Sequence, residues 1–329
     1  MNLLESSEKI FIAGARGMVG SSIYRILKKH GFGRDELGGK LFCPSRKELN
    51  LENYDEVNNW FNSNKPSIVI LAAAEVGGIH ANNSRPADFI LKNLKIQTNL
   101  TELSFIHNVK RFLFLGSSCI YPKFAKQPIQ EESLLSGSLE ETNQWYAIAK
   151  IAGLKLCQSL TIQHNFDAIS LMPTNLYGEN DNYHPSDSHV LPALIRKFWL
   201  AKESNIPTVS CWGTGKPLRE FLFVDDLAEA CLFTLKNWDQ TKEKLRNQEI
   251  NWLNVGSNFE ISIKELALKI SKIIGYNGEI IWDESNPDGT LRKKLDTTKI
   301  NELGWEAKTD LDEGISKVIK SLKTKNSFF

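Results

Sequence analysis

The chain has 329 residues, and its 40 Lys and Arg nearly balance its 39 Asp and Glu, which leaves a formal net charge of +1. This balance argues against a general polyanion binder, so we expect no nucleic-acid partner. Hydrophobic residues make up 41% and charged residues 24% of the chain, a globular mixture that argues against extensive disorder.

The early chain shows no segment typical of a membrane protein. Its longest apolar stretch, residues 68–74, has seven residues, whereas a spanning helix needs about 20. Residues 1–8 lack the basic start and apolar run of a signal peptide. The five cysteines are widely spaced and form no Cys-x-x-Cys or zinc-ligand pair. We therefore expect a reduced, cytoplasmic chain with mostly buried thiols, no metal and no membrane partner.

In the first half of the chain, short apolar runs alternate with amphipathic segments. The pattern predicts strands at Lys9–Ala13, Lys40–Cys43, Ser67–Ala73, Arg111–Gly116 and Ala168–Met172. It predicts helices at Met18–His30, Tyr54–Asn62, Pro86–His107 and Gln144–His164. Strands of this length separated by helices indicate βαβ units, and hence an α/β fold with a doubly wound parallel sheet of the Rossmann type.

After Pro173 the pattern loosens. A polar loop at Tyr177–Ser188 precedes predicted helices at His189–Lys202, Asp225–Asn237, Ile263–Ile274 and Asp310–Lys323. Predicted strands lie at Thr208–Cys211, Trp252–Val255 and Glu279–Trp282, and Lys236–Gln248 reads as a charged connection. We expect a dinucleotide-binding domain of residues 1–176 with a returning segment at about 219–240. Residues 177–218 and 241–329 would form a smaller mixed α/β substrate-binding domain.

Three glycines follow the first predicted strand and open the first predicted helix. The segment reads Gly14-Ala15-Arg16-Gly17-Met18-Val19-Gly20, a spacing variant of the dinucleotide-binding fingerprint. Glycines permit a tight turn and a close approach of the backbone to a pyrophosphate at the helix N-terminus. The glycines alone would suit an ordinary loop, but the strand–turn–helix context favours a dinucleotide.

The end of the second predicted strand indicates which dinucleotide binds. An NAD site usually carries an acidic residue there for the ribose hydroxyls. This chain reads Cys43-Pro44-Ser45-Arg46-Lys47, with no acid before Glu48. Arg16 and Arg46, with Ser45, suit a 2′-phosphate, so the predicted cofactor is NADP(H). The alternative is that Arg46 and Lys47 belong to a solvated loop.

Tyr146 and Lys150 lie four residues apart and share one face of a predicted helix. We expect the ammonium to lower the phenol pKa, so that Tyr146 can exchange a proton with a substrate carbonyl or hydroxyl. Such a pair is often only a surface pair. Ser117 makes the set more specific, because it follows a predicted strand at the sheet edge where ligands bind.

With these residues the chain resembles the extended short-chain dehydrogenase/reductase family, and within it the branch that makes GDP-L-fucose from GDP-4-keto-6-deoxy-D-mannose. The resemblance covers nearly the whole chain. It rests on the glycine segment and on Ala72-Ala-Ala-Glu-Val-Gly-Gly-Ile79, Ala81-Asn-Asn83, Leu115-Gly-Ser-Ser-Cys-Ile-Tyr-Pro122, Tyr146-Ala-Ile-Ala-Lys-Ile-Ala-Gly153, Met172-Pro-Thr-Asn-Leu-Tyr-Gly178, His184-Pro, Ser188-His-Val190 and Arg219-Glu-Phe-Leu.

The resemblance implies a reductive triad of Ser117, Tyr146 and Lys150. It also implies that Cys119 and His189 shuttle protons during inversion at carbons three and five of the 4-keto sugar, before hydride transfer from NADPH to carbon four. The expected cofactor contacts, besides the glycine segment, are Arg46, Leu115, Gly116, Ser117, Ser118, Lys150, Pro173, Thr174, Asn175, Leu176 and His189. The implied contacts to the GDP-sugar are Lys197, Trp212, Arg219 and Asp288; for Trp212, ordinary interdomain packing is the alternative.

Taken singly, Cys119 reads as a small buried hydrophobe and His189 as a capping or packing residue. Together they suit an inversion, which removes a proton on one face of a carbon and returns one on the other. Cys119 lies two residues after Ser117, so an extended segment would direct both side chains to the same side. The order in which the two residues act stays open.

The remaining implications and alternatives concern assembly and reaction type. The resemblance implies a homodimer through the Pro86–His107 and Tyr146–His164 helices, whose apolar faces would equally suit packing within one chain. A dehydratase is disfavoured, because related dehydratases carry an Asp-Glu pair where this chain has Ser118 and Cys119. Another nucleotide-sugar 4-epimerase or 4-reductase is the nearest alternative. A non-catalytic dinucleotide-binding regulator is a further one, since fold does not fix function.

Overall fold

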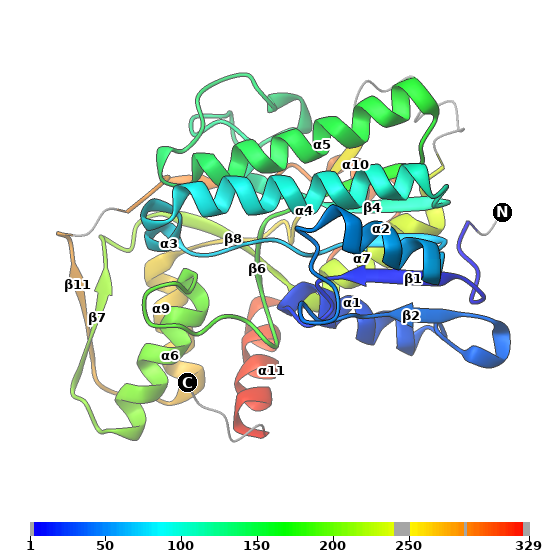
Figure 1. The fold of residues 1–329 in the computed structure, drawn as a ribbon. Helices are drawn as coiled ribbons and strands as arrows, with labels where there is room; N and C mark the ends of the chain where they lie inside the picture. Colours follow the sequence, from blue (N-terminus) through cyan, green and yellow to red (C-terminus); the bar gives the residue numbers. More distant parts are fainter. Residues whose placement is uncertain (1–2, 240–250, 286–287, 325–329) are drawn as a thin grey trace.

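The computed structural model describes residues 3–239, 251–285 and 288–324 (Figure 1). Six parallel strands form its central sheet, in the order β2-β1-β3-β4-β5-β9. Their bounds are β1 Lys9–Ala13, β2 Lys40–Phe42, β3 Ile68–Leu71, β4 Arg111–Leu115, β5 Ala168–Pro173 and β9 Trp252–Val255. The predicted doubly wound parallel sheet is confirmed.

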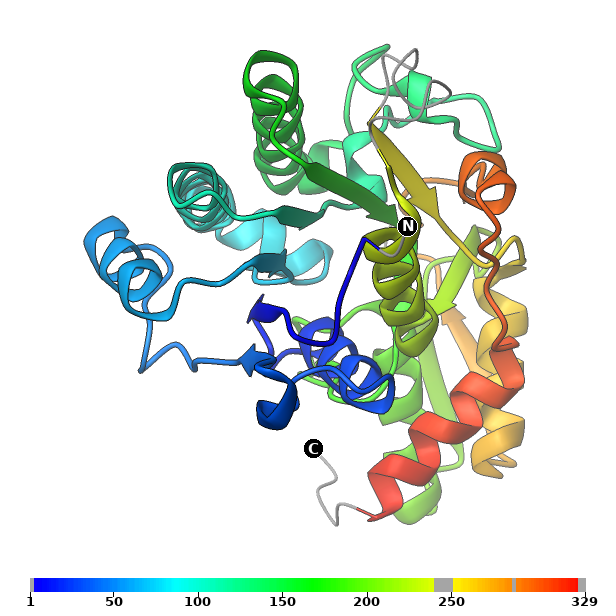
Figure 2. The same ribbon diagram turned by 90° about the vertical axis from the view of Figure 1, so that its right-hand side faces the viewer.

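Helices cover both faces of this sheet, as the end-on view in Figure 2 shows. On one face lie α1 (Met18–Lys29) and α7 (Val224–Asn237). On the other lie α2 (Tyr54–Asn64), α4 (Pro86–Ile106) and α5 (Gln144–His164). The two faces are sorted by the alternation of side chains along each strand: Ile10 and Ile12 belong to the first core, and Phe11 and Ala13 to the second.

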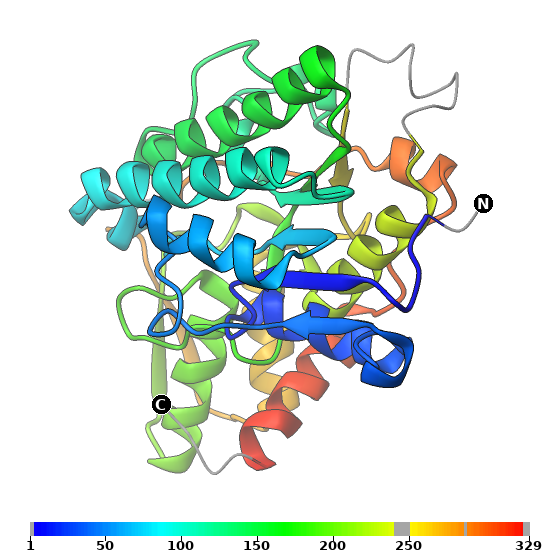
Figure 3. The same cartoon turned by 45° about the vertical axis from the view of Figure 1, so that its right-hand side comes forward.

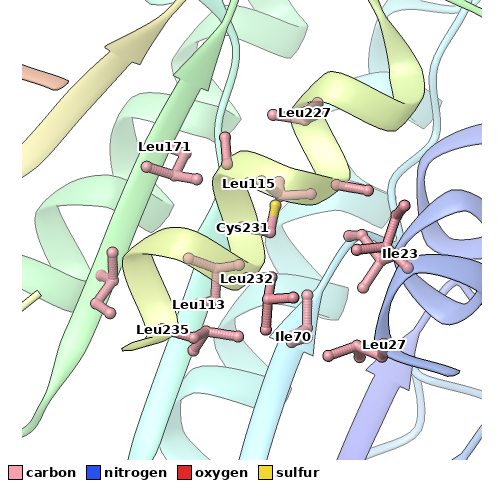
Figure 4. Packing of buried hydrophobic residues seen from close by; sticks show 14 of the residues in the cluster. Ile23, Leu27, Ile70, Leu113, Leu115, Leu171, Leu227, Cys231, Leu232 and Leu235 are labelled. Carbon is pink, nitrogen blue, oxygen red and sulfur yellow. The ribbon is translucent and has the colours of Figure 1, made fainter. Parts of the chain in front are cut away.

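The first core depends on a helix that comes from late in the sequence. Figure 4 shows Leu227, Cys231, Leu232 and Leu235 of α7 against the strands of the sheet and against α1. Helix α7 thus packs on the central sheet beside α1. The five cysteines are free thiols, and Cys157, Cys211 and Cys231 are buried.

The second part of the chain packs beside the carboxyl ends of the central strands, below the sheet in Figure 3. Strands β6 (Asn175–Tyr177), β10 (Glu260–Ser262) and β12 (Arg292–Lys293) all pair with β8 (Leu218–Phe223), and β7 (Thr208–Trp212) pairs with β11 (Glu279–Asp283). Helices α6 (Val190–Glu203), α9 (Ile263–Ile274) and α11 (Leu311–Thr324) share its separate core. The short helices are α3 (Ile79–Ser84) and α10 (Thr298–Glu302).

The structure differs from the sequence prediction mainly in the second part. Strand β9 belongs to the central sheet, whereas its residues were predicted to lie in the substrate-binding domain. Strands β6, β8, β10 and β12 were not predicted; three of them are two or three residues long, and all are completed by partners distant in sequence. From residue 240 onward, the charged connection lies outside the described residues. No helix in the part of the chain that the structure describes is long and apolar enough to cross a membrane.

Candidate active site

The glycine loop connects β1 to α1 at the carboxyl edge of the central sheet. Gly14 has a φ of +85°, and a Cβ atom there would lie 2.7 Å from the Ala73 nitrogen. A Cβ atom on Gly20 would collide with the Gly14 carbonyl oxygen. The fold itself therefore requires these two glycines. A Cβ atom on Gly17 would make only an ordinary 3.5 Å contact, so packing does not explain the third glycine.

The N-terminus of α1 is open to an anion. Gly17 is its N-cap residue and supplies no side-chain hydrogen bond, and the first turn holds no acidic residue. Backbone N–H groups and the positive end of the helix dipole are thus available at an exposed glycine. This arrangement fits the pyrophosphate of a dinucleotide, and it gives Gly17 a reason to lack a side chain.

Of the residues predicted to hold a 2′-phosphate, Ser45 and Arg46 follow β2 and Arg16 lies in the glycine loop. Two carboxylates accompany them. Arg46 pairs with Glu52 at 2.8 Å, and Arg16 lies 3.7 Å from Glu48. The amide and the hydroxyl of Ser45 each donate to Glu48 at 2.7 Å, and these bonds hold the Glu48 pKa below its usual range. The arginine side chains remain 73% and 72% exposed, so a phosphate can reach both cations.

Ser117, Tyr146 and Lys150 come together where α5 passes the end of β4. The Lys150 Nζ donates to the Leu115 carbonyl oxygen at 2.8 Å and lies 5.7 Å from the centre of the Tyr146 ring. The Ser117 side chain lies near enough to the Tyr146 hydroxyl to lower its pKa. Because Lys150 is only 3% exposed, the Tyr–Lys pair is not a surface pair.

Burial dominates the titration of this pair. It raises the Tyr146 pKa above its usual range and lowers the Lys150 pKa to about 8. The prediction that Lys150 lowers the Tyr146 pKa is wrong for this structure, because the group that lowers this pKa is Ser117. The Lys150 ammonium instead donates to the Leu115 carbonyl oxygen.

The prediction of an extended segment from Ser117 to Cys119 is also wrong. Residues Ser118–Ile120 form a 3₁₀ helix capped by Ser117, whose hydroxyl accepts a hydrogen bond from the Cys119 N–H at 3.2 Å. The capping turn replaces the strand because the serine side chain satisfies a free amide. Cys119 still lies close enough to Tyr146 for its charge to raise the Tyr146 pKa.

His189 is the N-cap residue of α6, but its side chain makes no cap hydrogen bond. Protein atoms packed around the ring displace water from it and so lower the pKa of the imidazole, although the residue remains exposed. The structure gives the ring no hydrogen-bond partner among the residues it describes, Cys119 included. The imidazole is therefore available to a ligand, and the capping role weighed from the sequence is absent.

The other predicted cofactor contacts line the same edge of the sheet. A Cβ atom on Gly116 would collide with the sulfur of Met172, so the ends of β4 and β5 pack closely. Thr174 donates its amide to the Val255 carbonyl oxygen at 3.0 Å. Asn175 donates its side-chain amide to the Glu220 carbonyl oxygen at 2.8 Å, which fixes the segment that also holds Pro173 and Leu176. Ser118, which follows Ser117 at the end of β4, is buried.

Two predicted substrate residues form an exposed aromatic surface beside a cation. Trp212 ends β7 and is 61% exposed. Lys197, on α6, donates to the Ser210 carbonyl oxygen at 2.9 Å and lies 5.5 Å from the centre of the Trp212 ring. A buried packing role for Trp212 is therefore not observed. A flat exposed ring next to a cation suits a nucleobase and its phosphates.

Arg219 and Asp288 lie close to one another at the entrance to β8 and β12. Burial lowers the Arg219 pKa, and the nearby charges of Asp288 and Glu140 raise it. Asp288 accepts hydrogen bonds at 2.7 Å from both the amide and the hydroxyl of Thr214, which hold its pKa below the usual range. Asp288 thus fixes the turn that follows Trp212.

Three residues at the site were not predicted from the sequence. Asn143 Nδ2 lies 3.4 Å and Lys293 Nζ lies 3.6 Å from the Cys119 sulfur. Glu140 pairs with Lys123 at 3.1 Å and accepts a hydrogen bond from the Thr290 hydroxyl at 3.1 Å. No local pattern marks these residues, since each contact joins segments far apart in the chain.

The comparisons with known proteins agree with this geometry. The model of the NAD dependent epimerase/dehydratase family matches residues 10–251. The chain is 53% identical to the putative GDP-L-fucose synthase 2 of Arabidopsis thaliana, covering 95% of this chain and 91% of the relative. It is 48% identical to the GDP-L-fucose synthase of Escherichia coli K12, covering 94% and 95%.

A solved structure adds a bound cofactor to the comparison. The Campylobacter jejuni GDP-mannoheptose C4 reductase MlghC, solved with NADP bound, superposes with a TM-score of 0.88 at 38% identity. The match covers 97% of this chain and 99% of the reductase.

Proposed function

Because the chain belongs to the NAD dependent epimerase/dehydratase family, we propose that it converts GDP-4-keto-6-deoxy-D-mannose to GDP-L-fucose with NADP(H). The reaction inverts carbons three and five of the 4-keto sugar and then reduces the ketone. The observation that carries the proposal is the Cys119 thiol beside the Ser117–Tyr146 pair, at the edge where the glycine loop opens. About half of the residues are identical to those of GDP-L-fucose synthases, which supports the same substrate.

In the reduction step, Tyr146 would donate its proton to the ketone oxygen. Bound NADPH supplies the hydride to carbon four, and the oxygen of the reduced carbon takes up the phenolic proton. A raised phenol pKa keeps that proton on Tyr146 until the substrate oxygen becomes basic. Ser117 would hold the phenol hydroxyl by a hydrogen bond, and the Lys150 Nζ lies 5.7 Å from the centre of the Tyr146 ring.

In the epimerisation steps, Cys119 and His189 would exchange protons with carbons three and five. Both carbons flank the ketone, so loss of a proton leaves an enolate that the carbonyl stabilises. The inversion needs one group that removes a proton and one that returns it from the other face. The half-buried Cys119 thiol and the His189 imidazole, which has no hydrogen-bond partner in the described part of the chain, would supply two such groups on separate elements.

Incubation with the GDP-4-keto sugar and NADPH in deuterated water tests the proposal. NMR of the product should show GDP-L-fucose with deuterium at carbons three and five, and NADPH should be consumed. A 4-epimerase or 4-reductase would give product without label at these carbons, and a regulator would give no turnover. Either result would contradict the proposal.

Three variants assign the residues. Tyr146→Phe should bind NADPH and exchange deuterium but lose hydride transfer. Cys119→Ser and His189→Gln should bind NADPH but lose most of the exchange. Near-normal reduction by the tyrosine variant would remove it from the triad, and wild-type exchange in both of the others would make the pair structural.

We also propose a cytoplasmic homodimer. Helices α4 and α5 lie side by side on one face of the molecule (Figure 1), and Leu91, Ile106 and Ile162 on them are 53%, 50% and 76% exposed. A second copy would cover these apolar side chains. Five free cysteines suit a reducing compartment. Light scattering should give twice the 37.2 kDa chain mass, and Ile162→Asp should shift it toward one chain.

A further inference from the structure

The Cys119 sulfur faces two nitrogen donors. Asn143 Nδ2 lies 3.4 Å from it and Lys293 Nζ lies 3.6 Å from it. An ammonium has no lone pair, so Lys293 can only donate in this contact. A sulfur accepts a hydrogen bond much more strongly as a charged thiolate than as a neutral thiol. The geometry therefore places two donors where they would stabilise a negative charge on the sulfur.

The thiol is the one polar partner that the structure gives the Lys293 ammonium among the residues it describes. The neighbouring cations are committed elsewhere: Arg292 pairs with Glu260 at 2.5 Å, and Lys299 lies 2.5 Å from Glu132. Lys293 is also half-buried, so water screens its charge less than it would at the surface. The positive charge of Lys293 therefore acts mainly on the Cys119 sulfur.

Backbone pairing on one side and a side-chain hydrogen bond on the other hold Lys293 in this place. Strand β12 pairs with β8 so that Lys293 lies opposite Arg219, and the Leu218 amide donates to the Leu291 carbonyl oxygen at 2.8 Å. On the other side, Thr290 donates to Glu140, which lies three residues before Asn143. The same link therefore positions both donors that face the sulfur.

We propose that Lys293 is a positioning residue that stabilises the Cys119 thiolate for proton abstraction. The inference rests on the proposed function. When the thiolate acts, the carbon–hydrogen bond of the sugar breaks, a sulfur–hydrogen bond forms, and the electron pair passes to the enolate. Lys293 keeps all its protons and loses only its anionic partner. The charge on Lys293 thus favours the reactive form of the free enzyme.

Alkylation of Cys119 by iodoacetamide at pH 7, without any sugar substrate, tests this proposal. Because the thiolate is the nucleophile, the rate reports the charged form, and peptide mass spectrometry separates Cys119 from the other four cysteines. Lys293→Met should slow alkylation by about tenfold, the effect of an opposite charge at this range. Lys293→Arg should restore much of the rate, because it returns the charge.

Lys294→Met is the matched control, since it removes the same charge at the next position along the chain. Equal Cys119 alkylation rates in the two methionine variants would overturn the proposal. So would a raised KM for the GDP-sugar with an unchanged alkylation rate, which would make Lys293 a phosphate ligand. If Lys293→Met does not fold, Lys293→Gln serves in the same comparison. Alkylation needs no turnover, so an inactive wild type would refute the proposed function and leave this result standing.

Discussion

Replacing Lys150 with methionine tests the buried charge of the proposed triad. Burial lowers the Lys150 pKa from 10.5 to about 8. A lowering of this size means that burying the ammonium costs about 3 kcal/mol of folding free energy. Methionine removes this cost and also removes the hydrogen bond to Leu115, which is worth about 1 kcal/mol.

The sign of the pH dependence follows from proton binding. Below pH 8 both the folded and the unfolded chain hold the proton on Lys150, and the full cost is present. Between pH 8 and 10.5 the folded chain has lost a proton that the unfolded chain keeps, so the free energy of unfolding rises with pH. Methionine does not titrate. The wild type should therefore gain up to about 3 kcal/mol relative to Lys150→Met across this window.

Urea unfolding followed by circular dichroism at pH 7, 8, 9 and 10 measures this difference. Comparing two proteins cancels the other titrating groups, and Lys95→Met, at an exposed position on α4, controls for the loss of one lysine. The reasoning is refuted if the free energy of unfolding of the wild type, minus that of Lys150→Met, stays constant or becomes more negative as the pH rises. It would mean that the ammonium is solvated and not held against the Leu115 carbonyl.

Three further predictions concern binding, and a fourth concerns stability. Arg46→Ala should raise the KM for NADPH by about tenfold and leave the KM for NADH nearly unchanged, since it removes one charge-assisted bond to the 2′-phosphate. Steady-state kinetics with both cofactors measures this, and equal effects on the two KM values would exclude Arg46 from the 2′-phosphate site. Arg219→Ala should raise the KM for the GDP-sugar by about tenfold with little change in NADPH affinity by fluorescence titration; a collapse of NADPH binding would contradict it. Gly20→Ala should lower the free energy of unfolding by about 1–3 kcal/mol because its Cβ meets the Gly14 carbonyl, whereas Gly17→Ala should fold normally and bind NADPH weakly. Thermal unfolding with a cofactor titration separates them, and tight NADPH binding by Gly17→Ala would displace the pyrophosphate from this loop.

The central sheet was largely predictable because its signals are local. Strands such as β3 and β4 are buried on both faces and read as continuous apolar runs. The glycine loop and the Tyr146–Lys150 spacing are likewise written in neighbouring residues. Strand β8 has a different origin, since its partners β6, β10 and β12 come from separate parts of the chain and are very short. Such pairing has no period that a sequence window can detect.

The sequence by itself determined the central sheet and indicated the dinucleotide loop and the Tyr146–Lys150 pair, because strand–turn–helix units and helical spacing depend on adjacent residues. The proposed roles of Cys119 and His189 came from the family resemblance. Tertiary structure decided the pKa values of those residues and the directions of their side chains. The 3₁₀ turn after Ser117 sets the direction of Cys119, and burial rather than the Lys150 charge sets the Tyr146 pKa. The Lys293 ammonium reaches the Cys119 sulfur across 174 residues of sequence through the register of β12 on β8. Contacts of this kind depend on how distant segments pack, so only the folded chain reveals them.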